Sequence, residues 1–255
     1  MTTHDPYDAI GRYYALEQGE QNDDLPFFLE LAGHTGGPVL DLGAGAGRVT
    51  AALADAGYDV TALEASETML GLARTALEPH LGKHATLAPG DMLNFKLDGR
   101  YPLAVCAAGT FAHVTDEVDQ LRMLRTVRRH LAPEGILALV LQNPYQLVVD
   151  PPRSEVVVQW RGIDPQTEDG ITKLVTNDAE LGPQLLHVGV MYDVVRRDGS
   201  LRRFETEFTL RWSYQRELEL LLQKAGFGAA EWYGDYDRSP YSGESPLLIV
   251  VTQNS

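Results

Sequence analysis

A short acidic and glycine-rich stretch contains the residues best suited to bind a small charged ligand. An apolar run contains Asp41, and the loop Gly43-Ala44-Gly45-Ala46-Gly47 follows it. Glycines let a backbone approach a ligand closely and adopt positive φ angles, and an aspartate just before such a loop can accept hydrogen bonds from an ammonium group. The next apolar run ends at Glu64, which is placed to accept both hydroxyls of a ribose. These residues predict a site for a nucleoside that carries an amino acid.

The glycine spacing disfavours a ligand that contains a pyrophosphate. The dinucleotide fingerprint has the form G-x-G-x-x-G. Counted from Gly43, its third glycine would fall at position 48, which is Arg48. The G-x-G-x-G spacing, preceded by Asp41, therefore favours an aminoacyl nucleoside over a dinucleotide.

Alternating strands and helices position these residues. Apolar runs predict strands, and helical periodicity predicts the helices between them. The strands are expected over 38–42, 58–64, 85–92, 101–109, 136–144, 229–237 and 246–253, and the helices over 47–57, 66–77, 115–135 and 214–228. Such alternation is typical of an α/β fold with a mostly parallel, Rossmann-like sheet that has helices on both faces.

The pattern changes between about 154 and 212, where apolar residues alternate with period two. The sequence RRDGSL over 196–201 is a hairpin turn signal. We therefore expect a small antiparallel sheet inserted into the α/β fold. The expected parts are an N-terminal helical lid over 1–36, an α/β domain over 37–145 and 213–255, and an antiparallel flap over 146–212.

The segment VLDLGAGAGRVT, with Glu64 and the GDM sequence at 90–92, resembles the class I methyltransferases that use S-adenosylmethionine. The resemblance covers about residues 36–145 and the last helix and two strands. It implies a seven-stranded sheet with an antiparallel last strand, and S-adenosyl-L-homocysteine as the product. It also implies that Asp91 binds the adenine amino group. The cofactor-binding residues implied by the resemblance are Asp41, Gly43, Ala44, Gly45, Glu64, Ala65, Met69, Gly90, Asp91, Met92 and Ala107.

The methyl acceptor is expected to be a small molecule. Enzymes that methylate nucleic-acid bases often carry an N-P-P-[YFW] motif after the fourth strand, where this chain reads AAGTFAHV over 107–114. The formal net charge is −15, from 36 acidic and 21 basic residues. Such a chain repels phosphate backbones, so DNA, RNA and acidic membranes are poor partners.

The sequences that follow the fourth strand and lie near the C-terminus resemble those of bacterial small-molecule methyltransferases. That group includes antibiotic-tailoring, amino-sugar and lincosamide-type N-methyltransferases. It often has Asn or Gln before the histidine of F-x-H, where this chain has Ala112. The resemblance implies methyl transfer to an amine nitrogen of a secondary metabolite. Two alternatives stay open: an O-methyltransferase with His113 as base, and a protein that binds S-adenosylmethionine without transferring its methyl group.

Four residues are candidates for the reacting part of the site. Tyr7 and Tyr13 lie in the expected lid, where a tyrosine can cover the cofactor or contact the sulfonium by a cation–π interaction. Tyr14, beside Tyr13, is expected to point to a different helix face. Phe111 and His113 follow the fourth strand, at the carboxyl edge of the sheet where ligands bind.

The overall composition gives expectations about the cellular compartment and the oligomeric state of the protein. Hydrophobic residues make up 44% of 255, enough for a full core, and Cys106 is the single cysteine. One cysteine fits a reducing cytoplasm, and the first residues do not form a signal peptide pattern. No His, Cys and Asp spacing predicts a metal, and no apolar run is long enough for a membrane span. An inserted antiparallel sheet is a common place for subunits to meet. The sequence leaves the oligomeric state open, and a homo-oligomer, if one forms, is expected to assemble through the flap.

Overall fold

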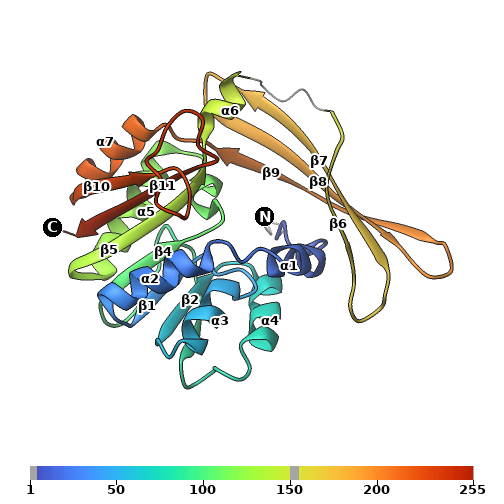
Figure 1. Cartoon of the computed structure of the whole chain (residues 1–255), viewed down its shortest axis with the longest axis horizontal. Helices are drawn as coiled ribbons and strands as arrows, with labels where there is room; N and C mark the ends of the chain where they lie inside the picture. Colours follow the sequence, from blue (N-terminus) through green and yellow to red (C-terminus); the bar gives the residue numbers. More distant parts are fainter. Residues whose placement is uncertain (1–4, 150–154, 255) are drawn as a thin grey trace.

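One large twisted sheet forms the body of this computed structural model, which describes residues 5–149 and 155–254 (Figure 1). The described residues place seven strands in the order β10-β11-β5-β4-β1-β2-β3. The strands are β1 Val39–Leu42, β2 Val60–Glu64, β3 Ala85–Pro89, β4 Tyr101–Cys106, β5 Leu131–Gln142, β10 Phe227–Tyr233 and β11 Leu247–Asn254. β11 is antiparallel to β5 and β10, and the other neighbouring pairs are parallel. The predicted α/β class with a mostly parallel seven-stranded sheet is confirmed.

Helices cover both faces because alternate strand residues point to opposite sides. Val39 of β1 joins the apolar cluster that includes residues of α2 and α3, whereas neighbouring Leu40 joins the cluster that includes residues of α5 and α7. No helix in the described ranges is both long and apolar enough to span a membrane. The helices are α1 Gly11–Gly19, α2 Leu25–Thr35, α3 Arg48–Asp55, α4 Glu67–Ala76, the 3-10 helix η1 Thr110–His113, α5 Glu117–His130, α6 Pro144–Val149 and α7 Gln215–Ala225.

The strand order reverses between β1 and β4. After β1 the chain builds the sheet outward through β2 and β3, and then crosses back to place β4 on the other side of β1. Asp41 pairs with Ala62 of β2 and with Val105 of β4, so the carboxyl ends of the three strands lie level. Ligands of open α/β sheets bind at such a switch point, outside the carboxyl ends of the strands.

The inserted segment forms a separate four-stranded antiparallel sheet, as predicted. Its strands are β6 Val157–Ile163, β7 Gly170–Glu180, β8 Leu185–Val195 and β9 Leu201–Arg211, in the spatial order β6-β7-β8-β9. The predicted hairpin turn joins β8 to β9, where the Arg196 amide donates to the carbonyl of Ser200 and Gly199 has φ of 80°. This sheet projects away from the α/β body, and α1 lies between it and α4 (Figure 1).

Two element boundaries differ from the sequence prediction. The expected helix over 115–135 ends at His130, because Leu131 already pairs with Tyr101 at the start of β5. The residues 146–149, expected in the flap, belong to α6 instead. Asn143 explains this helix start, since its side-chain oxygen accepts a hydrogen bond from the amide of Tyr145.

Candidate active site

A cavity of about 1360 Å³ lies at the carboxyl ends of β1, β2 and β3. Its wall combines the glycine loop, the strand ends, the start of α4, the N-terminal segment and a loop of the antiparallel sheet that contains Asp164. The structure brings all eleven residues expected to bind the cofactor to this one wall: Asp41, Gly43, Ala44, Gly45, Glu64, Ala65, Met69, Gly90, Asp91, Met92 and Ala107. Asp41 and Ala107, the first and last of these residues, are 66 positions apart in the sequence and line the same cavity.

The loop after β1 has a backbone shape that requires glycine. Gly43, Gly45 and Gly47 have φ of 65°, 58° and 89°, in the left-handed region that L side chains rarely adopt. A Cβ atom on Gly43 would overlap with Cγ2 of Thr110, and one on Gly47 would lie 2.9 Å from Leu77. The first and third glycines therefore allow close packing of the loop against its neighbours, and the bend leads directly into α3.

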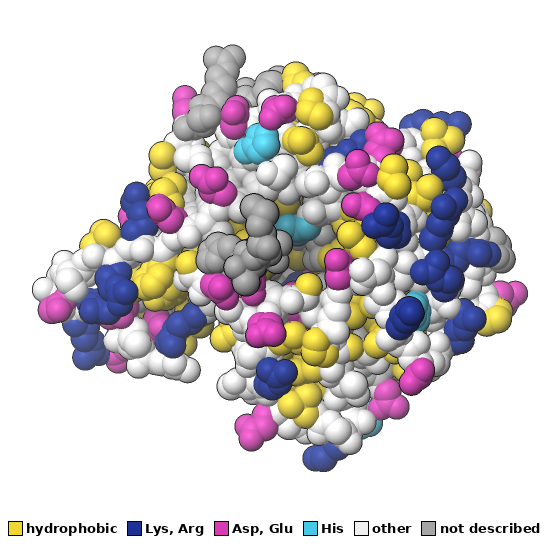
Figure 2. Space-filling model, turned by 180° about the vertical axis from the view of Figure 1, so that it is seen from behind, with side chains coloured by type: hydrophobic (Ala, Val, Ile, Leu, Met, Phe, Trp, Pro, Cys, Tyr) yellow, Lys and Arg dark blue, Asp and Glu magenta, His cyan; other side chains and the backbone are white. Residues whose placement is uncertain are grey.

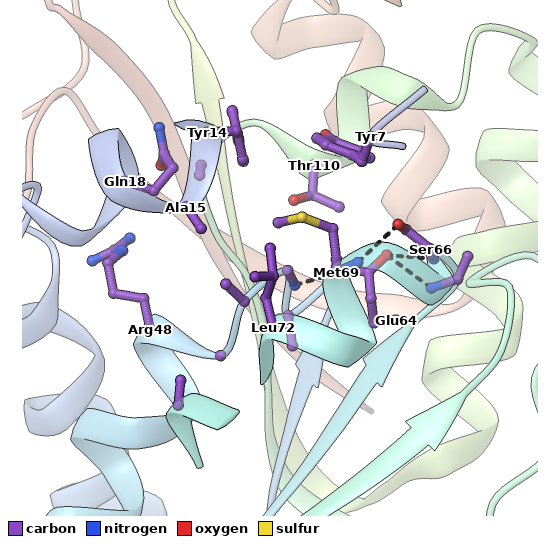
Figure 3. Close-up of a pocket in the computed structure, with 18 of the residues that line it drawn as sticks. Tyr7, Tyr14, Ala15, Gln18, Arg48, Glu64, Ser66, Met69, Leu72 and Thr110 are labelled. Atoms are coloured by element: carbon purple, nitrogen blue, oxygen red, sulfur yellow. Dashed lines mark hydrogen bonds between the residues drawn. The ribbon is translucent and has the colours of Figure 1, made fainter. Parts of the chain in front are cut away.

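Glu64 is held at the end of β2 by three backbone amides. Its Oε2 accepts a hydrogen bond of 2.8 Å from the amide of Gly45, and its Oε1 accepts bonds of 2.9 Å from the amides of Ala65 and Ser66 (Figure 3). Each carboxylate oxygen can accept a further bond. The side chain is thus fixed in place and keeps acceptor capacity for ligand hydroxyls.

Asp41 is a buried carboxyl whose hydrogen-bond donors belong to the uncharged residue Thr50. Its side chain is almost completely buried, and the hydroxyl of Thr50 on α3 donates to Oδ2 at 2.7 Å. Burial raises the pKa of Asp41 to about 6, and the Thr50 bond and the positive charge of Arg48 oppose that rise. A carboxyl in this setting gains stability from a cationic ligand group, because that group replaces lost hydration of the charge.

Aromatic side chains close the opposite side of the cavity. Tyr7 and Tyr14 of the N-terminal segment line it, and their ring centroids lie 5.3 Å apart. Phe208 of β9 joins this pair to His113, with centroid distances of 5.4 Å to Tyr7 and 5.5 Å to His113. Figure 3 shows Tyr7 and Tyr14 across the cavity from Glu64. Tyr7, Tyr14 and His113 therefore form one aromatic wall of the cavity, and Phe208 of the antiparallel sheet contacts both Tyr7 and His113.

The ionisable groups of this wall are neutral at pH 7. Burial raises the pKa of Tyr7 and raises that of Tyr14 to about 12. Burial lowers the pKa of His113 below the ordinary 6.5, because the charged imidazolium is poorly hydrated there. The aromatic wall consequently faces the carboxylates of the opposite wall as an uncharged surface.

A family model described as a methyltransferase domain matches residues 39–135, the span that holds the glycine loop, Glu64 and Asp91. The chain is an S-adenosylmethionine-dependent methyltransferase. The methyltransferase is 26% identical over 220 residues to cypemycin N-terminal methyltransferase from Streptomyces sp, an alignment that covers 86% of the chain and 83% of that relative.

Solved structures share the fold of the methyltransferase over nearly its whole length. The CcbJ methyltransferase from Streptomyces caelestis has a TM-score of 0.78 at 23% identity, and the superposition covers 97% of each of the two chains. CalS10, an amino pentose methyltransferase from Micromonospora echinaspora solved with bound S-adenosylmethionine, has a TM-score of 0.74 at 18% identity, with 96% of this chain and 97% of that chain covered. The inserted antiparallel sheet is thus within the span that these structures share.

The cavity of the methyltransferase suits the charges of its cofactor. S-adenosylmethionine carries an ammonium, a sulfonium, two ribose hydroxyls and an adenine amino group, all of which carboxylates can bind. Asp41, Glu64 and Asp91 present carboxylates on one wall, and the aromatic wall lies opposite. Among the described residues, no group of three or more His, Cys, Asp or Glu is arranged to hold a metal ion.

Two of the expected acceptor-site residues lie outside the cavity wall. Phe111 is fully buried in the core beneath α5, whereas its neighbours Thr110 and His113 line the cavity. The cause is the 3-10 geometry of η1, which has three residues per turn and so places residues i and i+3 on one side. Phe111 therefore does not line this cavity, whereas Thr110 does.

Tyr13 is also directed away from the cavity. Its ring packs on Phe204 and Tyr192 of the antiparallel sheet, with centroid distances of 4.9 Å and 5.8 Å. Tyr14, which was expected on a different face, lies on the cavity wall beside Tyr7. The sequence does indicate that Tyr13 and Tyr14 face different ways, but which one faces the cavity depends on how α1 docks.

Sequence reasoning misses several residues that shape the site. Thr50 lies on the first turn of α3, on the buried face of that helix, and its hydroxyl donates to Asp41. A helical projection of the sequence would place this polar residue on the apolar face and so could have identified it. Arg48 forms a bidentate ion pair with Asp24, with distances of 2.5 Å and 2.6 Å, and donates to the carbonyl of Gln21. It thereby ties the α1–α2 connection to the glycine loop.

The N-terminal segment contacts the rest of the molecule on two sides. Towards α4, Asp5 accepts a hydrogen bond of 2.6 Å from Ser66. Towards the antiparallel sheet, the buried carboxylate of Glu17 accepts bonds of 2.9 Å from Lys173 and 2.5 Å from Tyr192. Ile10 is fully buried in the apolar core of that sheet. α1 is therefore anchored in the antiparallel sheet and covers the cavity from there.

Proposed function

We propose that this methyltransferase transfers the methyl group of S-adenosylmethionine to an amine nitrogen of a small molecule, such as an antibiotic precursor. The observation that carries the proposal is the uncharged aromatic wall, which faces the carboxylates across the cavity. An ammonium group is stabilised by aromatic faces and by nearby carboxylates. An acceptor amine is therefore attracted to this cavity in its cationic form.

We assign the cofactor to the carboxylate wall. Asp41 receives the ammonium of the methionine part, Glu64 receives the ribose hydroxyls, and Asp91 receives the adenine amino group. Met69 and Met92 line the same cavity and supply apolar surface for the ribose and the base. When bound, S-adenosylmethionine supplies an already activated methyl group, so the protein has to provide alignment and exclusion of water.

The acceptor has to lose a proton before its nitrogen can attack. His113 lines the cavity, and its lowered pKa leaves it uncharged at pH 7. A neutral imidazole has one nitrogen that can accept a proton, so His113 can take the proton from the acceptor ammonium. Solvent can serve the same purpose for an amine, and His113 is therefore expected to assist without being essential.

The names of similar proteins favour nitrogen as the acceptor atom. The sequence relative is an N-terminal methyltransferase for cypemycin, and one structural relative acts on an amino pentose. The second candidate function is methyl transfer to a hydroxyl. It is favoured by the position of His113, because a hydroxyl is a poor nucleophile until a base removes its proton.

Product analysis tests the acceptor atom. The enzyme is incubated with ¹³C-methyl-labelled S-adenosylmethionine and a panel of amino sugars, peptide amines and matched alcohols, and the position of the label is determined by NMR. His113→Ala is expected to retain transfer to nitrogen with kcat reduced by about 10-fold to 100-fold. A label on oxygen, or complete loss of transfer in His113→Ala with unchanged cofactor affinity, would favour the hydroxyl acceptor.

A further inference from the structure

Arg211, at the end of β9, is a buried cation where the antiparallel sheet meets the α/β body. Figure 2 shows Lys and Arg side chains exposed on the projecting part of the molecule at the left, whereas Arg211 is only 4% exposed. Its Nη1 donates a hydrogen bond of 3.0 Å to Oε1 of Gln120 on α5, and its Nη2 donates to the carboxylates of Glu117 on α5 and Glu217 on α7. One guanidinium therefore joins the sheet to two helices of the body.

Gln120 extends this network to the backbone that follows η1. Its side chain is fully buried, and its Nε2 donates a hydrogen bond of 3.0 Å to the carbonyl of Val114, the residue after His113. A guanidinium carries donors only, so Arg211 requires the amide oxygen of Gln120 on its side and thereby directs the amide nitrogen towards Val114. A single side chain thus separates Arg211 from the backbone that carries His113.

Phe208 lies on the opposite face of the same strand. Alternate residues of a strand point to opposite faces, so Phe208 and Arg211, three positions apart, project from different sides of β9. The ring of Phe208 contacts those of Tyr7 and His113, and β9 lies beside η1. The end of β9 is therefore held by Arg211 from one side and presents Phe208 to the aromatic wall on the other.

We propose that Arg211 is a positioning residue for methyl transfer, which sets the places of His113 and Phe208 without touching the acceptor. Arg211 is not among the described residues that line the cavity. The proposal rests on the proposed function only in that the acceptor meets the aromatic wall, and it holds for a nitrogen and for an oxygen acceptor. A displacement of about 1 Å in a reacting group can lower the rate about 100-fold, so a residue that fixes η1 and β9 affects the reaction from a distance.

Arg211→Lys is the first test variant, and Arg203→Lys is its matched control. Lysine keeps the charge but has no planar fork with which to reach Gln120 and both carboxylates. Arg203 stands on the same strand and forms a pair with Asp193 through two bonds of 2.7 Å, with 45% of its side chain exposed. Gln120→Met is a second variant, which keeps the two carboxylates around Arg211 and removes the hydrogen bond to Val114.

The His113 imidazole gives a readout that needs no acceptor. Its ring-proton NMR signals, identified by their absence in His113→Ala, are sensitive to the ring of Phe208, whose centroid lies 5.5 Å away in an edge-on arrangement. We expect these signals to shift in Arg211→Lys and Gln120→Met and to stay in place in Arg203→Lys. Calorimetry is expected to show unchanged affinity for S-adenosylmethionine in all three variants, because the carboxylates assigned to the cofactor lie on other elements.

Kinetics measure the consequence for the reaction. With the compound of the acceptor panel that the wild-type enzyme methylates fastest, Arg211→Lys is expected to lower kcat/KM per cofactor-binding site about 100-fold, and Arg203→Lys is expected to leave it unchanged. Counting per cofactor site removes the contribution of unfolded protein, so a purely structural role would leave the value unchanged.

The proposal is overturned by unshifted His113 signals in folded Arg211→Lys and Gln120→Met, by an unchanged kcat/KM per site, or by an equal loss in the control. If no compound of the panel is methylated, the failure lies with the proposed acceptor class, and the NMR signals alone decide the role of Arg211.

Discussion

The hydroxyl of Thr50 donates a hydrogen bond of 2.7 Å to Oδ2 of Asp41, and both side chains are buried. A buried carboxyl with a neutral partner is costly when it is ionised, because burial removes its hydration. The pKa of Asp41 near 6 expresses that cost. In our proposal the carboxyl is retained because the ammonium of S-adenosylmethionine offsets the cost when it binds.

Asp41→Asn is therefore expected to stabilise the protein without cofactor. The folded-state pKa lies near 6, above the ordinary 3.8, so this group favours folding most at low pH and loses that contribution as the pH rises through 6. Above that pH the isosteric amide avoids a cost on the order of 3 kcal/mol. Urea unfolding at pH 7.5 should show a higher unfolding free energy for the variant, and at pH 4 the two proteins should converge. An unchanged or lower value at pH 7.5 would contradict this account of Asp41.

Cofactor binding is expected to release a proton near pH 6. There about half of the Asp41 carboxyls are protonated in the free enzyme, and binding of the ammonium requires the ionised form. Calorimetry in buffers of different ionisation enthalpy should detect release of roughly half a proton per cofactor at pH 6. At pH 8 the release from this group should vanish. Proton uptake at pH 6 would be inconsistent with the ammonium at Asp41.

Gly43→Ala is expected to weaken cofactor binding by about 100-fold or more. Its Cβ would overlap with Thr110, and φ of 65° adds backbone strain of roughly 1–2 kcal/mol. Gly57→Ala is the matched control, since Gly57 has φ of 89° and open space around it. The control should lose a similar amount of stability and keep cofactor affinity. Combining Gly43→Ala with Thr110→Ser should restore part of the affinity, because the overlapping methyl group is removed.

Glu17→Gln is expected to loosen α1 from the antiparallel sheet. The carboxylate is 4% exposed and pairs with Lys173, which is 8% exposed, so the substitution leaves a buried cation without its counter-charge. Loss of one partner of such a pair costs about 3–5 kcal/mol. Limited proteolysis near the N-terminus should become faster, and methyl transfer slower. Glu20→Gln, on the exposed end of the same segment, should behave like wild type in both measurements.

The strand, loop and helix unit from β1 to β2 could be predicted from the sequence because its signals are local. Apolar runs indicate the strands, and the glycine spacing indicates the bend, so Asp41 and Glu64 are placed at one edge of the sheet without knowledge of the rest of the chain. The same holds for the hairpin at 196–201. Eleven wall residues follow from these local signals and from the resemblance.

The acceptor side could not be predicted in the same way, because it depends on contacts between distant segments. Tyr14 lies on the wall because α1 docks on the antiparallel sheet through Glu17 and Lys173, which are 156 positions apart. Phe208 comes from β9 and meets Tyr7 across two hundred residues. The choice between Phe111 and Thr110 depends on the 3-10 form of η1, which residue types alone do not specify.

Calorimetric titration with S-adenosylmethionine tests directly whether Asp41 binds the ammonium of the cofactor. The wild-type chain is expected to bind one cofactor. Folded Asp41→Asn, whose stability is checked in parallel, is expected to lose at least about 30-fold in affinity, because the amide offers no charge to the ammonium. Full cofactor affinity in the Asp41→Asn variant, or NADH binding in place of S-adenosylmethionine to the wild-type protein, would contradict these expectations.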